Sequence, residues 1–424
     1  MMEIVTPETV GISTERLTRV KEWLINQVSF DRVAGASVII ARHGKVALWE
    51  TTGMSDKEQG KPFEKDTIVR LYSMTKPVTT LAAMMLFEEG HFQMDDPVEK
   101  FLPIFADTRV WVGGDSGIEN TKPQEQSMTV LNLMTHTSGL TYDFHHANVV
   151  DEHYRQPGML TQSSEYNLEE WISRLAEIPL IFQPGSRWNY SVSTDILGRL
   201  VEIWSGMSLQ KFFQERIFYP LGMVDCGFHV KPAENHRFAA LYDAVGSAGL
   251  GQSNAGRKPK GIALRESSTD SVFLEPAAFF SGGGGLIGTM QDYARFCQML
   301  LNRGQLDGKR LLGRKTVDYM RLNHLPENRD MAAMGQAVWS ETTYEGIGFG
   351  LGWAVVIDPV KAQMMTSVGE HHWGGAASTF FWIDPDEDLY VIYLSQLMPS
   401  SSYPIRRELR SLVYQTLIDK IGLI

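Results

Sequence analysis

The sequence predicts a mixed α/β fold in which one antiparallel sheet is built from both ends of the chain and a mainly helical lobe is inserted between them. Two observations lead to this prediction: strand patterns near each end, and helical spacing in the middle. The first strand pattern is Ala36–Ala41 followed by Lys45–Trp49, with His43-Gly44 between them. Apolar, β-branched runs on either side of a glycine turn indicate a hairpin.

The second strand pattern lies near the C-terminus. Ser378–Ile383 and Leu389–Leu394 are rich in apolar and aromatic residues. Between them, Asp384-Pro385-Asp386 suits a turn between antiparallel strands. Both chain ends are therefore expected to contribute strands to one sheet.

Apolar residues recur at helical spacing in the middle of the chain. The three clearest runs are Leu168–Leu175, Thr194–Trp204 and Ser208–Ile217. We expect a discontinuous α/β domain over residues 1–95 and 280–424, flanked by helices, and a helical lobe over residues 96–279. A cleft between the two is the natural place for a site. Gly246–Asp270 has few large apolar side chains and is predicted to form a mobile surface loop.

The bulk composition is that of a globular protein large enough for two lobes. The chain has 424 residues, of which 43% are hydrophobic and 21% are charged. Chains of this length usually exceed one hydrophobic core. The formal net charge of −11 provides no broad basic surface, which argues against nucleic acid and membranes as partners.

Location and redox chemistry are predicted from the termini and the cysteines. Residues 1–8 lack the basic start and apolar stretch of a signal peptide, and no later run is long enough to cross a bilayer, so a cytoplasmic protein is expected. Cys226 and Cys297 lie far apart and outside any metal-ligand spacing. We expect two buried thiols, with no disulfide, metal or cofactor.

Ser73-Met74-Thr75-Lys76 is the first candidate for catalytic chemistry. It follows an apolar stretch and precedes an amphipathic run, so Ser73 is predicted to lie near a helix start. Residues three apart share a helix face, which allows Lys76 to reach back to Ser73. A serine hydroxyl needs a base, and a lysine can serve as that base only if burial lowers its pKa from about 10.4.

The four-residue motif does not decide the matter alone. A chain of this length contains about one S-x-x-K by chance, and this chain contains a second one at Ser208-Leu209-Gln210-Lys211. Ser208 is interpreted as an ordinary helix cap with Lys211 in solvent. The choice of Ser73 therefore depends on its context.

The context is a pair of later segments. Tyr190 lies in Arg187–Val192, and Trp373-Gly374-Gly375 begins a run of small residues that continues to Thr379. The order S-x-x-K, Y-x-x and then a small-residue strand resembles the serine β-lactamase and penicillin-binding protein fold, and Trp-Gly-Gly in third place is similar to family VIII carboxylesterases. The resemblance extends over Leu131–Leu140, Gly282–Leu286 and Gly348–Trp353.

The resemblance implies a role for each candidate residue. Ser73 would be the nucleophile, Lys76 its base, and Tyr190 the group that relays a proton to the leaving alcohol. As in class C β-lactamases, backbone N–H groups would form the oxyanion hole, here those of Ser73 and Ala376. Small residues in the third motif let substrate lie close to the backbone.

Substrate binding is assigned to four residues. Trp373, Gly374 and Gly375 are expected to line the site, although a glycine-kinked strand that needs close packing is a minor alternative for the glycines. Tyr142 resembles a second tyrosine that lines the pocket of related esterases and acyltransferases. A partly buried loop aromatic is an equally good interpretation of Tyr142.

Two departures from the β-lactamase pattern point to the substrate. Val192 stands where Y-x-N has an amide, and Trp373 stands where K-T-G has a lysine. The groups that would bind a β-lactam carboxylate are thus replaced by apolar ones, which favours small uncharged esters over penicillins. We expect a carboxylesterase with at most weak β-lactam hydrolysis, acting on a small-molecule ester.

Two other functions stay open beside this one: an acyltransferase on the same fold, and a non-catalytic penicillin-binding-like protein. The sequence leaves open the natural ester, its acyl chain length and the oligomeric state.

Gly282–Gly285 lacks the Lys-Ser/Thr of a phosphate loop and is interpreted as close packing. The pairs His145-His146 and His371-His372 lack a third ligand, and no G-x-S-x-G elbow occurs.

Overall fold

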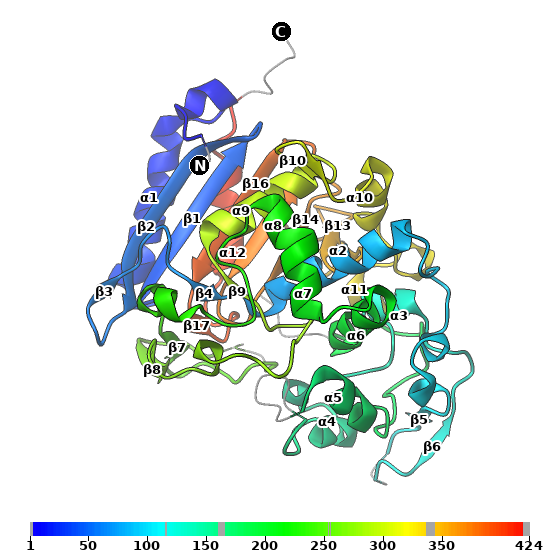
Figure 1. The fold of residues 1–424 in the computed structure, drawn as a ribbon. Coiled ribbons are helices and arrows are strands. Elements are labelled where there is room, and N and C mark those ends of the chain that lie inside the picture. Colours follow the sequence, from blue (N-terminus) through cyan, green and yellow to red (C-terminus); the bar gives the residue numbers. More distant parts are fainter. Residues whose placement is uncertain are drawn as a thin grey trace.

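The computed structural model describes residues 3–114, 117–159, 166–252, 254, 256–335 and 344–418. An eight-stranded antiparallel sheet dominates one side of the molecule, with strand order β12-β13-β14-β15-β16-β1-β2-β3 (Figure 1). In its centre, β16 (Leu389–Ser395) lies between β15 (Phe380–Asp384) and β1 (Gly35–Arg42). The predicted sheet built from both chain ends is confirmed.

The other strands of this sheet complete its two edges. They are β2 (Lys45–Asp56), β3 (Lys61–Pro62), β12 (Ile347–Phe349), β13 (Ala354–Val356) and β14 (His371–Gly374). The predicted hairpin forms between β1 and β2, where His43 and Gly44 both take positive φ. Such backbone angles match the twist of a tight hairpin turn.

Helices cover both faces of the sheet, and this is why β1 is buried along its whole length. Alternate residues of β1 enter two different apolar clusters: Ile39 packs with α9 (Met290–Leu301), and Val38 packs with α1 (Thr14–Ser29) and α12 (Ile405–Tyr414). Successive strand side chains point to opposite faces. A sheet covered on both faces therefore shows a continuous apolar run rather than alternation.

The middle of the chain is mainly helical, as predicted, and lies to one side of the sheet (Figure 1). Its helices are α3 (Val130–Met134), α4 (Val149–His153), α5 (Leu168–Leu175), α6 (Ser193–Ser205), α7 (Leu209–Phe213) and α8 (Tyr219–Leu221). The bounds of α5 match the prediction, because Asn167 and Glu170 cap its start reciprocally. The division into residues 1–95 with 280–424, and 96–279, stays a prediction.

Shorter elements connect these parts. They are β4 (Val69–Arg70) with β9 (Ile287–Gly288), β5 (Arg109–Trp111) with β6 (Thr121–Pro123), β10 (Gln305–Leu306) with β11 (Lys309–Arg310), and the helices α10 (Arg314–Met320) and α11 (Met331–Met334). Within the described ranges, no helix combines the length and the apolar character that a membrane span requires.

Two expectations from the sequence are wrong. The helix after Ser73, α2 (Thr75–Glu88), is not amphipathic: it is buried all round from Thr75 to Leu86, because it runs through the middle of the molecule. The segment Gly246–Asp270 is not all loop either. Its residues Ile262–Glu266 form β8, which pairs with β7 (Leu241–Ala244) and through it with β17 (Leu397–Met398).

A buried ion pair ties the last helix to the sheet. Glu370 precedes β14 and is fully buried, and Arg410 of α12 donates to both of its carboxylate oxygens, at 2.8 and 3.0 Å. Burial alone would raise the pKa of Glu370, but Arg410 and His372 outweigh burial and hold this pKa well below its ordinary value. Both partners of the pair are thus charged in the folded protein.

We predict that Arg410→Met lowers the free energy of unfolding by about 3–5 kcal/mol, because it leaves the Glu370 charge buried without its partner. Urea unfolding followed by circular dichroism measures the change. As a control, Lys21→Ala removes the partner of Glu50 in a half-exposed pair and should cost less than about 1 kcal/mol. Equal losses in the two variants would contradict this assignment.

Candidate active site

Ser73 lies at a sharp turn between a strand and a helix. β4 leads into a single 3₁₀ turn, Tyr72–Met74, and α2 follows directly. Tyr72 takes a φ of 46°, an unusual value for an aromatic residue, and its ring packs edge-on against Phe273. Tyr72 and Met74 are buried, whereas Ser73 keeps part of its surface exposed. The turn thus presents the serine hydroxyl while it anchors both neighbours.

Lys76 lies one helical turn after Ser73 and is fully buried. Its Nζ is 3.2 Å from Ser73 Oγ, 3.0 Å from the Tyr142 hydroxyl and 2.6 Å from the Gly283 carbonyl oxygen. Burial lowers the pKa of Lys76 to about 7, although the negative charge of Asp195 opposes this shift. The structure therefore brings Ser73, Lys76 and Tyr142 together, and it favours the buried-pocket interpretation of Tyr142.

Tyr190 completes the group from the segment that precedes α6. The centroid of its ring lies 4.6 Å from the ammonium nitrogen of Lys76. Burial raises the pKa of Tyr190 well above its ordinary value, and nearby Ser73 and Trp373 oppose that rise. In the described part of the chain, its hydroxyl has no hydrogen bond of standard geometry. The phenol is therefore protonated and has hydrogen-bonding capacity to spare.

Aromatic rings enclose the three polar groups. The ring centroid of Tyr190 lies 5.3 Å from that of Trp373, 5.1 Å from that of Tyr142 and 4.9 Å from that of His136. Phe349 packs edge-on against Trp373 at 5.3 Å. Burial and the nearby Lys76 hold the pKa of His136 well below its ordinary value, so the ring is neutral. The surroundings of Ser73 are therefore largely apolar.

Sequence reasoning assigned no role to His136, Trp188 or Phe349, which all contact this aromatic group. They lie in the segments Leu131–Leu140, Arg187–Val192 and Gly348–Trp353, which supported the resemblance only as whole motifs. Aromatic residues at such positions are hard to distinguish from ordinary core residues without a structure.

Trp373, Gly374, Gly375 and Ala376 form a wall beside the backbone that leads into the Ser73 turn. The expected small-residue strand is shorter than predicted: β14 ends at Gly374, and the chain turns before β15. A side chain at Gly375 would overlap the carbonyl oxygen of Leu71, and one at Gly374 would overlap the Arg406 guanidinium. The two glycines therefore allow the turn that carries Ala376 to pack against the backbone just before Ser73.

The Gly282–Gly285 segment is closely packed, as predicted. A Cβ at Gly282 would lie 2.7 Å from the carbonyl oxygen of Thr194, and one at Gly283 would lie 2.5 Å from Oδ2 of Asp195. The sequence did not reveal a second property of this segment, which is that the Gly283 carbonyl oxygen is the nearest hydrogen-bond partner of the Lys76 amine.

Three of the four paired histidines have hydrogen-bond partners within the protein. His145 Nε2 lies 2.6 Å from the Tyr190 carbonyl oxygen, His371 Nδ1 lies 3.2 Å from that of Gly369, and His372 Nδ1 lies 2.8 Å from Glu370 Oε1. Among the residues that the structure describes, no three His, Cys, Asp or Glu side chains gather as a metal site would need. These histidines orient backbone and carboxylate groups.

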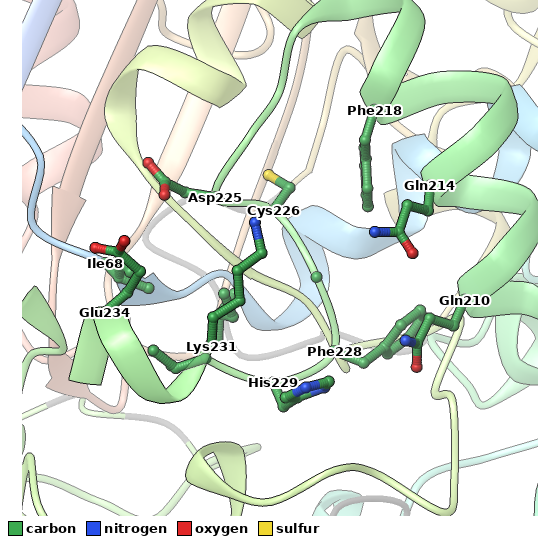
Figure 2. Close-up of a pocket in the computed structure, with 13 residues that line it drawn as sticks. Ile68, Gln210, Gln214, Phe218, Asp225, Cys226, Phe228, His229, Lys231 and Glu234 are labelled. Carbon is green, nitrogen blue, oxygen red and sulfur yellow. The ribbon is translucent and has the colours of Figure 1, made fainter.

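A separate cavity of about 170 Å³, which Ser73 does not line, lies beside Cys226 (Figure 2). Burial raises the pKa of the Cys226 thiol well above its ordinary value, and the nearby Asp292 charge adds to this. The charged groups at the cavity are engaged elsewhere: Lys231 donates to the Val224 carbonyl, and Asp225 pairs with Arg237. The cavity therefore offers neither a reactive thiolate nor a free charge.

Comparison with known proteins gives a consistent set of matches. A family model described as Beta-lactamase matches residues 23–415. Esterase EstB of Burkholderia gladioli is 33% identical over 395 residues, or 90% of this chain and 91% of that esterase. An uncharacterized protein of Mycobacterium tuberculosis is 32% identical over 374 residues, or 87% of each chain. The structure of EstCE1, described as a hydrolase with promiscuous acyltransferase activity, has a TM-score of 0.75 at 26% identity and covers 94% of this chain and 99% of its own.

We predict that Gly375→Ala lowers the reactivity of Ser73 by about tenfold to a hundredfold, because the new methyl group forces the turn away from the backbone before Ser73. The rate at which a fluorophosphonate adds to the intact protein, followed by mass spectrometry, measures this. Gly249→Ala is the matched control, since the added methyl group there meets only the Gln252 side chain, at 3.6 Å. A Gly375→Ala protein that labels at the normal rate would show that the close approach of Gly375 to the Leu71 carbonyl oxygen is unimportant for the reactivity of Ser73.

Proposed function

The chain belongs to the Beta-lactamase family, and on that premise we propose that it hydrolyses small carboxylic esters through an acyl-enzyme formed on Ser73. One observation carries the proposal: the buried amine of Lys76 lies 3.2 Å from Ser73 Oγ, and its pKa is about 7. A group with this pKa is partly neutral near pH 7 and is strong enough to accept a proton from a serine hydroxyl during attack.

In the first step the Ser73 hydroxyl gives its proton to neutral Lys76 as its oxygen attacks the ester carbonyl. A neutral amine has two N–H groups and one lone pair. Since the Gly283 carbonyl and the Tyr142 hydroxyl can accept those two N–H groups, the lone pair is left for Ser73. In this proposal, backbone N–H groups of Ser73 and Ala376 stabilise the oxyanion.

In the second step the tetrahedral intermediate collapses and the alcohol departs with a proton. Tyr190 is the proposed relay for this proton, because its hydroxyl is protonated and its ring lies beside both Lys76 and Trp373. Water then attacks the acyl-enzyme by the reverse sequence of proton transfers, and Ser73 is regenerated.

The apolar surroundings support an uncharged ester as substrate. Trp373 presents an aromatic ring where a β-lactamase has a lysine, and Val192 supplies no amide. The similarity to Esterase EstB and to the hydrolase EstCE1 supports the same substrate class. The cytoplasmic location, expected from the sequence, stays a prediction.

A second candidate function is acyl transfer, in which an alcohol or amine replaces water at the acyl-enzyme. The description of EstCE1 as a hydrolase with promiscuous acyltransferase activity favours keeping this candidate. Adding a nucleophilic acceptor to the assay distinguishes it, because transfer would divert the acyl group into a new ester or amide. A purely binding role is disfavoured by the contact between Lys76 and Ser73.

We predict that kcat/KM for a short-chain p-nitrophenyl ester exceeds that for a chromogenic cephalosporin by at least about tenfold. The missing charge-assisted hydrogen bond to a β-lactam carboxylate is worth roughly 1.5–3 kcal/mol, or about tenfold to over a hundredfold. Ser73→Ala should abolish both activities. Ser208→Ala should leave both nearly unchanged, since Ser208 only caps α7 through the N–H of Lys211. A better rate with the cephalosporin would make the protein a β-lactamase.

We predict that kcat/KM for the ester rises with pH through a single ionisation near 7, because Lys76 accepts the Ser73 proton only in its neutral form. Below that pKa the amine is protonated and activity should fall about tenfold per pH unit. Initial rates across a constant-ionic-strength buffer series measure the profile. Lys76→Ala should lose nearly all activity, and Lys211→Ala should keep the wild-type profile. A flat wild-type profile would rule out Lys76 as the base.

A further inference from the structure

Asp195, the third residue of α6, carries a buried carboxylate. No motif in the sequence singled it out. It is 1% exposed, and its Oδ1 accepts hydrogen bonds from Ser281 Oγ at 2.6 Å and from the Gly283 N–H at 3.0 Å. Its Oδ2 has no hydrogen-bond partner among the described residues. Because a Cβ at position 283 would lie 2.5 Å from that same oxygen, only glycine fits there beside Asp195.

The peptide group between Gly282 and Gly283 links this carboxylate to α2. Its N–H donates to Asp195 Oδ1, and its carbonyl oxygen accepts a hydrogen bond from Thr79 Oγ1 at 2.7 Å. Thr79 lies one turn after Lys76 on α2. Asp195 and α2 therefore hold the glycine segment from opposite sides.

The next peptide group, between Gly283 and Gly284, leads to Lys76 itself. Its carbonyl oxygen accepts from Lys76 Nζ at 2.6 Å, and its N–H donates to Ser281 Oγ at 3.0 Å. Ser281 in turn donates to Asp195. A continuous chain of hydrogen bonds thus runs from the carboxylate through one peptide group to the amine, and bonds in such chains polarise one another.

Asp195 is also the carboxylate whose charge acts on Lys76. Burial raises the pKa of Asp195 itself, and the Ser281 hydrogen bond, the Lys76 charge and the Gly283 N–H oppose that rise. The other titratable groups that face Lys76 are Tyr142, Tyr190 and His136. Burial raises the pKa of both tyrosines and lowers the pKa of His136, so all three are neutral near pH 7. The charge of Asp195 raises the pKa of Lys76 against the effect of burial.

We propose that Asp195 is a positioning residue that holds the Gly283 carbonyl, and through it the amine of Lys76, in place beside Ser73. The proposal rests on the proposed function, in which Lys76 is the base. Asp195 fixes the direction of the amine through the two glycine peptides, and its charge sets how readily the amine gives up its proton. The glycine segment is the connection between the two residues.

The test compares two substitutions of Asp195. Asp195→Asn keeps an acceptor for Ser281 and Gly283 but removes the charge, so the Lys76 titration should move down by about half a pH unit or more. NMR of the protein labelled with ¹³C at lysine Cε, with the signal assigned through Lys76→Ala, measures this directly. The lower limb of the pH profile for fluorophosphonate labelling of Ser73 should move in the same direction. Asp195→Ala removes the acceptor too, and labelling at high pH should fall by about tenfold to a hundredfold.

Asp292→Asn is the matched control. Asp292 is also buried in the first turn of a helix, and it accepts backbone N–H groups of Val224 and Asp225, but it has no link to Lys76. This variant should lose stability and leave the Lys76 titration unmoved. An unmoved titration in Asp195→Asn, or an equal shift in Asp292→Asn, would overturn the proposal. The NMR result does not depend on turnover, so an inactive wild-type protein would count against ester hydrolysis and not against the role of Asp195. If Asp195→Ala does not fold, the Lys76 titration in Asp195→Asn decides whether Asp195 acts on Lys76.

Discussion

The amine of Lys76 is fully buried, and an ammonium group without water must either find compensating partners or lose its proton easily. The protein compensates the charge of this ammonium group only in part. A backbone carbonyl, a tyrosine hydroxyl and two aromatic faces surround the amine, and a carboxylate acts on it through intervening groups. The burial of α2 along most of its length makes this possible, because no solvent reaches the amine from its own helix.

The same exclusion of water acts in opposite directions on the neighbouring groups. It lowers the pKa of Lys76 toward neutrality, and it raises the pKa of Tyr190 and Tyr142 far above it. Near pH 7 the amine can therefore accept a proton while both phenols keep theirs. Burial is the largest influence on each of these pKa values, so it separates a base from the proton carriers beside it, and one apolar site can support acid and base steps together.

The sequence predicted the parts of this structure that side-chain patterns encode. The hairpin strands at both ends and α5 follow from apolar spacing and turn residues, and the grouping of Ser73, Lys76 and Tyr190 was implied by the resemblance of their motifs to a known family. The helix after Ser73 was expected to be amphipathic, but it is buried from Thr75 to Leu86. In the interior, Thr79 donates to the Gly282 carbonyl oxygen, and Thr75 accepts from the N–H of Leu286, the residue after the glycine segment. The role of the Gly283 carbonyl left no trace in sequence, since every residue carries one, and the helical spacing of Thr194–Trp204 did not distinguish Asp195 from any other residue of that helix.

The arrangement of the sheet has a consequence for the newly made protein. Because β16 inserts between β15 and β1, the N-terminal hairpin has one edge open until residues 389–395 have left the ribosome. Ser73 emerges early, but the Trp373–Ala376 wall follows only after tens of seconds at ordinary rates of translation. A nascent chain therefore carries a serine and a lysine without the wall that would complete their site. Esterase activity should therefore appear only after β15 and β16 have emerged and closed the sheet.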